Sequence, residues 1–175
     1  MNFNNADVKE VDFWSAEPRK EGCTLSKVEF TEGKYLDFTF KDKLGIPFRH
    51  REFEPSTQDG DADKLVKSIK TTVNRVKHIL RAFVDEATAD KVGGDTWEQY
   101  SNNIMKAFPS GYEKIPVALK VVLNKANYAC LPKVPAFISS ESNHKDFKIN
   151  PDYDKFVATA ANAPDGEPKT EEAVF

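Results

Sequence analysis

The chain of 175 residues is poor in cysteine and has no long apolar run. Its two cysteines, Cys23 and Cys130, form no C-x-x-C pair and have no histidine at metal-ligand spacing, so we expect no zinc site and two free thiols. No apolar segment reaches the roughly 18–20 residues that span a bilayer. Residues 1–7 show neither the basic nor the apolar region of a signal peptide, so we expect a cytoplasmic protein without membrane contact.

The sequence also lacks a recognisable catalytic motif. It contains no P-loop, Rossmann fingerprint, H-E-x-x-H or G-x-S-x-G. The three histidines are scattered, and we expect His78 to be exposed on a helix. Asp37, Asp42 and Glu52 could in principle hold a divalent metal or act as acid and base, but no motif pairs them. We therefore expect no enzyme activity, no cofactor and no metal.

Charge is unevenly distributed along the chain. Residues 1–150 carry 23 Lys and Arg against 22 Asp and Glu, whereas residues 151–175 carry two against six. A nearly neutral body next to an acidic segment indicates that the body can hold a local basic face.

Aromatic and β-branched residues at period two predict three strands within residues 25–54. In the clearest of them, Leu36, Phe38 and Phe40 occupy one face and alternate with polar residues on the other. We expect no regular element in residues 1–24, because Pro18 and Gly22 interrupt them.

A helix is predicted over residues 61–84, and a shorter one after residues 93–94. The first helix has one apolar stripe, made of Leu65, Ile69, Val73, Val76, Leu80 and Phe83. Two further strands are predicted at residues 117–123 and 128–131, and the compact region is expected to end at residues 137–138.

This order of three strands, helices and two strands predicts a mainly β fold with inserted helices, and specifically a five-stranded antiparallel OB-type barrel. The domain would span residues 1–156, with the helical insertion at residues 61–108. A disordered acidic tail would follow at residues 157–175. A general α+β sheet with two helices on one face is the competing architecture.

Single-stranded nucleic acid is bound by cations that follow the backbone and aromatic rings on which bases stack. The predicted strands carry both kinds of residue on polar faces. The candidates are Tyr35, Lys41, Arg49, Arg51, Phe53, Lys120, Lys125, Tyr128 and Lys133. Strand aromatics are also commonly buried, and lysines on an outer face are commonly just solvated, so each candidate has an ordinary structural alternative.

The last residues combine acidic and apolar side chains. Glu171 and Glu172 precede Val174 and Phe175, and Lys169 interrupts the acidic run. An aromatic ring behind carboxylates suits a pocket with a basic rim on a partner protein. We also expect this acidic segment to compete with DNA for the basic face, in which case its deletion would raise DNA affinity at low salt.

The acidic segment with a final Phe resembles that of bacterial and bacteriophage single-stranded DNA-binding proteins. The body resembles phage-encoded members in stretches at residues 34–40, 76–80 and 116–124, the last leading into residues 131–138. The resemblance covers roughly residues 25–155 loosely, plus the tail. The helical insertion is larger than in the bacterial type, and the tail is shorter and less acidic than in many members.

This resemblance implies a protein that coats single-stranded DNA in phage or bacterial replication, recombination and repair. Its tail would recruit partners such as polymerase, helicase or nuclease, and the protein could form homo-oligomers. Three alternatives remain: a protein-interaction adaptor, a small metal-dependent DNA-processing enzyme using Asp37, Asp42 or Glu52, and a double-stranded DNA binder using the basic helix.

Overall fold

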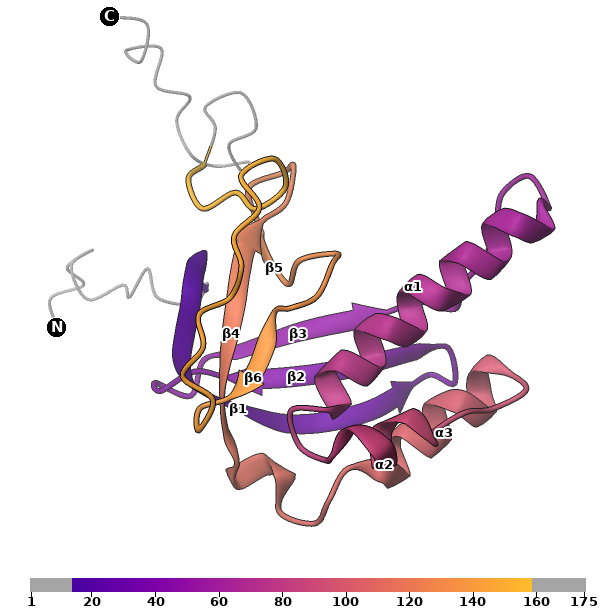
Figure 1. Cartoon of the computed structure of the whole chain (residues 1–175), viewed down its shortest axis with the longest axis horizontal. Coiled ribbons are helices and arrows are strands. Elements are labelled where there is room, and N and C mark those ends of the chain that lie inside the picture. Colours follow the sequence, from indigo (N-terminus) through magenta and orange to yellow (C-terminus); the bar gives the residue numbers. More distant parts are fainter. Residues whose placement is uncertain (1–13, 159–175) are drawn as a thin grey trace, which may run out of the picture.

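The computed structural model describes residues 14–158, which form a mainly antiparallel β-sheet with a few helices (Figure 1). The elements in chain order are β1 (Glu17–Thr31), β2 (Tyr35–Lys41), β3 (Pro47–Glu52), α1 (Ala62–Leu80), α2 (Glu86–Asp90), α3 (Trp97–Ala107), the short 3-10 helix η2 (Tyr112–Lys114), β4 (Pro116–Leu123), β5 (Ala129–Cys130) and β6 (Ile138–Ser140). None of the described helices is long and apolar enough to cross a membrane.

The long strand β1 organises the sheet. Its C-terminal part pairs with β2, its N-terminal part pairs with β4, and β3 extends the sheet beyond β2. Both β5 and β6 pair with the free edge of β4, so the strand order is β3-β2-β1-β4 followed by these two short strands. The sheet is open, with β3 at one edge and β5 and β6 at the other.

The expectation that residues 1–24 hold no regular element is wrong. β1 begins at Glu17 and runs through both Pro18 and Gly22. Its pairing shifts register between Lys20 and Cys23, and Gly22 adopts the left-handed backbone (φ 73°) within that irregularity. A glycine inside a strand commonly marks such a bulge, which bends the strand. The bend allows β1 to pair with β4 through its N-terminal part and with β2 through its C-terminal part.

Alternation along β2 and β3 agrees with the sequence prediction. Leu36, Phe38 and Phe40 are fully buried on the inner face. His50 and Glu52 of β3 point to the same side and are nearly buried. The odd-numbered residues of both strands therefore lie on the outer face.

Helix α1 lies against both edges of the sheet. At one edge, Arg75 Nε is 3.0 Å from Glu52 Oε1 of β3, and that same oxygen is 2.7 Å from His50 Nε2. At the other edge, His78 Nε2 accepts hydrogen bonds from the backbone N–H groups of Phe137 (2.9 Å) and Ile138 (3.3 Å). Arg75 and His78 are three residues apart and so are neighbours on the helix surface. The sheet is therefore curled enough for its two edges to meet one helical turn.

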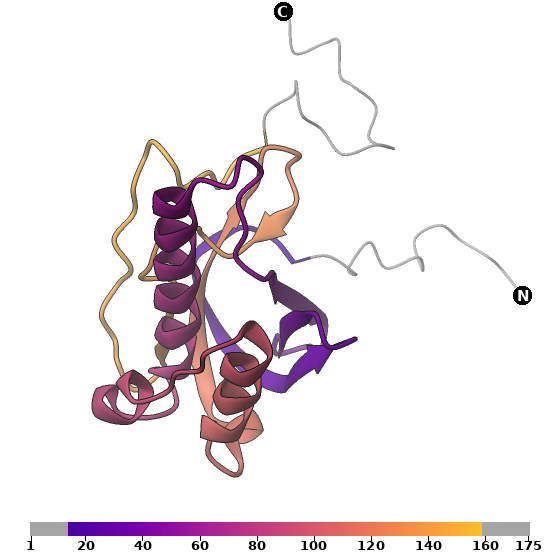
Figure 2. The same ribbon diagram turned by 90° about the vertical axis from the view of Figure 1, so that its right-hand side faces the viewer.

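Only the C-terminal half of α1 belongs to the core. Val76, Ile79 and Leu80 are fully buried there, whereas residues 61–67 are all exposed. Figure 1 shows this N-terminal half extending beyond the strands at the upper right, and Figure 2 shows α1 lying alongside the sheet. The prediction of a helix at residues 61–84 is confirmed over residues 62–80.

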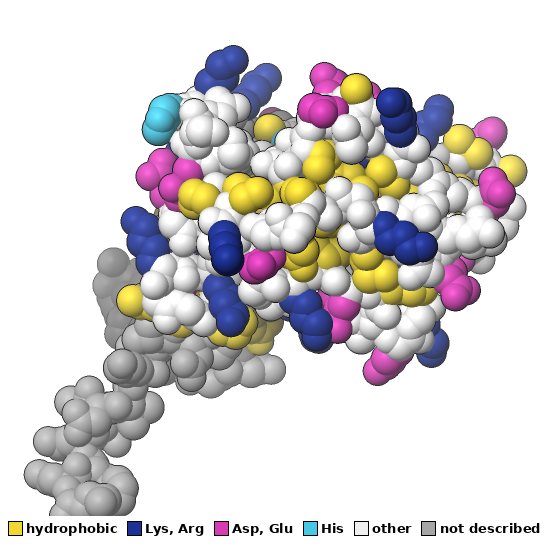
Figure 3. Space-filling model, turned by 90° about the horizontal axis from the view of Figure 1, so that it is seen from below, with side chains coloured by type: hydrophobic (Ala, Val, Ile, Leu, Met, Phe, Trp, Pro, Cys, Tyr) yellow, Lys and Arg dark blue, Asp and Glu magenta, His cyan; other side chains and the backbone are white. Residues whose placement is uncertain are grey.

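The second predicted helix is confirmed as α3, and α2 was not predicted. Trp97, at the start of α3, donates from Nε1 to the carbonyl of Lys34 (2.8 Å) and so fastens the turn between β1 and β2. Seen from below, hydrophobic side chains gather across the face that contains α2, α3 and η2 (Figure 3). Several half-buried side chains packed against the core come from these elements and their loops, including Phe83, Val92 and Tyr112.

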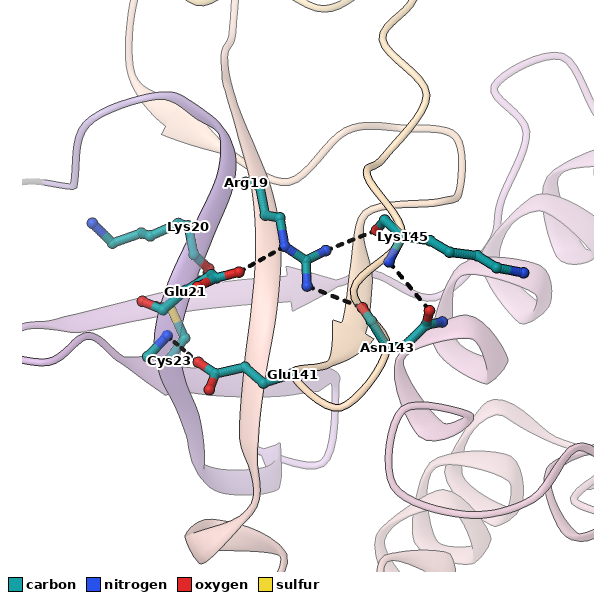
Figure 4. A network of polar contacts seen from close by, with 8 residues as sticks. Arg19, Lys20, Glu21, Cys23, Glu141, Asn143 and Lys145 are labelled. Atoms are coloured by element: carbon teal, nitrogen blue, oxygen red, sulfur yellow. Dashed lines mark hydrogen bonds and ion pairs between the residues drawn. The ribbon is translucent and has the colours of Figure 1, made fainter.

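The compact region does not end at residues 137–138 as expected. Residues 141–158, named here the strap, run back along β1 and β4. Arg19 of β1 donates to the carbonyls of Asn143 (3.0 Å) and Lys145 (2.9 Å), and the Gly22 N–H donates to the Glu141 carboxylate (Figure 4). Phe147 is buried under the Arg19 guanidinium, which lies 5.3 Å from the ring centroid. The strap thus covers sheet surface that would otherwise face solvent.

Candidate nucleic-acid interface

Three side chains stack on the outer face of β2 and β3. The guanidinium carbon of Arg51 lies 4.2 Å from the centroid of the Tyr35 ring. The Phe53 ring meets Tyr35 edge-on, with 5.4 Å between centroids. Because β2 and β3 are antiparallel, the start of one strand adjoins the end of the other. Phe53 is 61% exposed, so the stack presents an aromatic surface to solvent.

A buried carboxylate holds this stack in place. Asp37 is fully buried although it points to the outer face, because Arg51 covers it with two hydrogen bonds of 2.8 Å, from Nε and from an Nη atom. Thr31 of β1 adds a third hydrogen bond of 2.7 Å. Burial alone would raise the pKa of Asp37, but the hydrogen bonds from Arg51 and Thr31 outweigh it and lower the pKa below its usual value. Asp37 therefore stays ionised and fixes the orientation of Arg51.

The same face carries exposed cations that no ion pair holds within the described residues. Arg49 pairs in register with Thr39, and Lys41 with Pro47, farther along the two strands. Both side chains are exposed, and within residues 14–158 neither makes an ion pair. The neighbouring Lys27 of β1 is different, because it is bound to Glu29 (2.9 Å). Arg49 and Lys41 are thus the cations free to meet a phosphate.

The turn between β1 and β2 extends this surface. Lys34 is exposed beside Tyr35, and its carbonyl is the one held by Trp97. Sequence reasoning did not select Lys34, because a lysine in a turn carries no signal beyond solvation. From Lys34 to Lys41 the face follows β2 for about 23 Å at roughly 3.3 Å per residue. Aromatic surface lies at one end and free cations at the other.

One predicted site residue is not on an exposed face. Lys120 of β4 is only 4% exposed, and its Nζ is bound to Asp154 (2.8 Å) and to the carbonyl of Lys148 (2.9 Å) in the strap. The prediction assumed that the polar-looking face of β4 was open to solvent. It is closed because the strap covers it, and Lys120 is the buried half of an ion pair.

The remaining predicted residues lie at the other end of the sheet. Lys125 and Tyr128 belong to the turn between β4 and β5, which Asn124 Oδ1 orders by accepting from the N–H groups of residues 126 and 128. Tyr128 is 50% exposed, and Lys133 is exposed in the next loop. No hydrogen bond, ion pair or ring contact among the described residues joins them to the β2–β3 face. They form a separate group of exposed side chains.

Tyr153 is an exposed aromatic that sequence reasoning missed. It is 76% exposed and lies in the strap, two residues before Lys155. The Lys155 carbonyl accepts from Leu123 N–H, and Leu123 pairs with Ala129, so this part of the strap adjoins the β4–β5 turn. It was missed because residues 141–158 show no periodic pattern and were placed outside the compact region.

The three carboxylates considered for metal chemistry are dispersed. Asp37 lies on the outer face under Arg51, whereas Glu52 lies on the inner face between His50 and Arg75. Asp42 Oδ1 accepts from two backbone N–H groups in the β2–β3 turn. Within residues 14–158, no group of three or more His, Cys, Asp or Glu could hold a metal ion.

The cysteines are free thiols, as predicted, with Cys23 buried and Cys130 half-buried. Burial raises the pKa of the Cys23 thiol to about 12 and also raises that of Cys130. Neither thiol is activated as a nucleophile or a ligand.

The predicted partner-binding residues Glu171, Glu172, Val174 and Phe175 lie outside the described residues, as does nearly all of the predicted tail. Comparison of the whole chain with protein-family models, with curated proteins and with solved structures finds no match. The chemistry of the exposed surface is therefore the basis on which a function can be inferred.

Proposed function

We propose that this chain is a non-catalytic single-stranded DNA-binding protein that holds the strand on the outer face of β2 and β3. One observation carries the proposal: the stack of half-buried Tyr35 and Arg51 with exposed Phe53 shares a face with Arg49 and Lys41, which make no ion pair among the described residues. Aromatic faces accept any base, and unpaired cations accept the phosphates, which together give binding without sequence preference.

The architecture supports an OB-type interpretation. A long bulged first strand shared by two neighbours, helices between the third and fourth strands, and a curled sheet belong to this fold class. In this interpretation β5 and β6 are two pieces of one interrupted fifth strand, and α1 fills the gap where β3 would meet it. The face that OB folds use for oligonucleotides includes the second and third strands, where the stack lies.

The cellular role follows from the resemblance to phage and bacterial single-stranded DNA-binding proteins. In this role the protein coats and protects single strands during replication, recombination and repair in a bacterial or phage-infected cytoplasm. Residues 171–175 recruit a polymerase, helicase or nuclease through their acidic and apolar side chains.

Two of the other functions are less well supported by the geometry. A metal-dependent enzyme would need Asp37 and Glu52 to converge, but they lie on opposite faces of the sheet, and each is bound to an arginine. Reading a duplex with α1 is disfavoured because its exposed N-terminal half carries apolar side chains and no Arg, Asn or Gln that could read base edges. An adaptor would use the same exposed surfaces for protein contacts and would show no salt-sensitive DNA binding.

A titration with a fluorescent oligo-dT strand and a matched duplex, at two salt concentrations, tests the proposal. We expect tighter binding to the single strand, weakening with salt because phosphate contacts release counterions.

Replacing the exposed Phe53 with Ala should cost about 1–3 kcal/mol of binding free energy, the usual value of one stacked base. Ile149→Ala, an exposed apolar change in the strap, is the matched control and should bind as wild type. Absence of single-strand binding at low salt would contradict the proposal and favour the adaptor.

A further inference from the structure

The N-terminal half of α1 exposes an apolar stripe that nothing in the described structure covers. Leu65 is 36% exposed, Val66 50% and Ile69 43%, and none of the three belongs to the core cluster or packs against it. The stripe continues into Val73 and Val76, which do reach the core. A helix face that is apolar beyond the point where its own core ends is suited to contact with another molecule.

Charged residues beside the stripe are arranged so that they complement a second copy of the same helix. Asp63 and Lys70 are both exposed, and neither makes an ion pair within residues 14–158. They are seven residues, or two turns, apart and so lie on the same flank of the helix, beside Val66. When two identical helices pack antiparallel about a two-fold axis, the same flank of each helix meets its counterpart. With the axis near residues 66–67, Asp63 of each copy lies opposite Lys70 of the other.

We propose that the N-terminal half of α1 is a self-association surface, through which two copies of this chain pack antiparallel along Leu65, Val66 and Ile69. The resulting dimer is closed, because both copies use the same patch and neither keeps a free patch for a third copy. This surface is distinct from the β2–β3 face proposed for DNA, which lies on other elements.

The size of the patch indicates how strong the association is. A stable dimer buries about 800 Å² per partner, whereas here three turns of one helix are available. The contact is therefore weak between free molecules. It becomes effective when two copies are held side by side, since tethering raises the effective concentration to about millimolar. Neighbouring copies on one DNA strand meet this condition, and this last step rests on the proposed function.

Cysteine cross-linking of the full chain tests the surface without DNA. Val66→Cys in a Cys130→Ser background places a thiol close to the two-fold axis, while Cys23 remains buried. Thr71→Cys in the same background is the control, because Thr71 is exposed and lies on the side of the same helix opposite the apolar stripe. We expect mild oxidation to produce disulfide-linked dimers several-fold faster with Val66→Cys, in proportion to protein concentration. Equal rates for the two variants would overturn the proposal.

Charge reversal provides a second readout. Asp63→Lys and Lys70→Glu should each slow the cross-linking of Val66→Cys, and the double reversal should restore it, because both pairs are then re-formed with opposite sign. Failure of the double variant to recover, with helix content unchanged by circular dichroism, would overturn the antiparallel arrangement.

The chain's own acidic segment is the other possible occupant of this surface. If Val66→Cys combined with Val174→Cys yields only cross-linked monomers, the surface belongs to that segment and the proposal fails.

Discussion

Arg49 and Arg51 lie two residues apart on the same face of β3, yet their surroundings give them different roles. Arg51 is committed to Asp37 through two hydrogen bonds and covers one side of the Tyr35 ring. Its charge is largely compensated, so its contribution to binding is a planar surface. Arg49 makes no ion pair among the described residues, although its charge contributes to the lowered pKa of Asp37, and its exposed guanidinium is available to a phosphate. The sequence pattern predicted both as DNA-binding residues but could not distinguish them. The alternation within β3 does not reveal that β2 places Asp37 opposite Arg51 and Thr39 opposite Arg49.

Matched substitutions at the two positions should separate these roles. Arg49→Gln should weaken single-strand binding and reduce the slope of log affinity against log salt by about 0.7, the value for one phosphate contact with a single strand. Arg51→Gln should leave that slope nearly unchanged. It should instead lower the free energy of unfolding by about 1–3 kcal/mol, because the buried Asp37 loses its main partner. Affinity titrations at several salt concentrations and urea unfolding provide the measurements.

Lys106→Gln is a suitable control, since this exposed lysine lies in the last turn of α3, at the opposite end of the helix from Trp97, which holds the β1–β2 turn. Equal salt slopes for the Arg49 and Arg51 variants would show that their roles do not differ in this way.

Among the elements, α1 and β2 were predictable, whereas β1 was predictable only in its C-terminal part, from about residue 25. The apolar stripe of α1 and the alternation of β2 are local patterns with one buried face, which the sequence displays directly. β1 pairs first with β4 and then with β2 and carries register shifts between, so its alternation is broken. β4 was predicted as a strand, but its second face was misjudged. The strap that buries Lys120 is irregular, and no period-based argument could find it.

The junction of α1 with β6 depends on the protonation of His78. Its Nε2 accepts two backbone N–H groups, so this nitrogen must be unprotonated in the folded state. Burial, together with the nearby Arg81 charge, lowers the pKa of His78 to about 4. The expectation that His78 is exposed on the helix is wrong, because residues 137–138 lie against it. Periodicity placed His78 off the apolar stripe, which is correct, but could not reveal a strand on that side.

This junction predicts acid sensitivity. A histidine with a lowered folded pKa binds its proton more readily when unfolded, so stability is lost as the pH falls from about 6.5 towards 4. At pH 5 the loss relative to pH 7 should be about 2 kcal/mol from this residue. The side chain of the His78→Gln variant cannot be protonated in this pH range, and its amide oxygen can still accept hydrogen bonds from the two backbone N–H groups. Its unfolding free energy should therefore fall less between pH 7 and pH 5, as measured by urea titration. Parallel pH profiles for variant and wild type would refute this role of His78.

For the molecule as a whole, the order of elements was predictable and their assembly was only partly so. Three strands, helices and a terminal pair of strands can be read from periodicity and turn residues. Sheet curvature, the position of α1 between the two edges and the course of the strap depend on contacts between residues far apart in sequence, such as Arg75 with Glu52 and Lys120 with Asp154. Such contacts leave no local pattern. The candidate face was found because it needs only the two antiparallel strands β2 and β3.

The two proposed surfaces make a joint prediction for binding along a strand. Ile69→Glu places a charge in the exposed stripe of α1 and leaves the β2–β3 face intact. On an oligo-dT that holds one copy, its affinity should equal that of wild type. On a strand that holds several copies, wild type should fill the lattice cooperatively, whereas the variant should bind each site independently. Single-molecule imaging or titrations at increasing oligonucleotide length would measure the difference. Arg49→Gln should do the opposite, lowering affinity on short and long strands alike while keeping cooperativity. Wild-type cooperativity that survives Ile69→Glu would remove α1 from the contact between copies, and it would leave DNA binding by the β2–β3 face untouched.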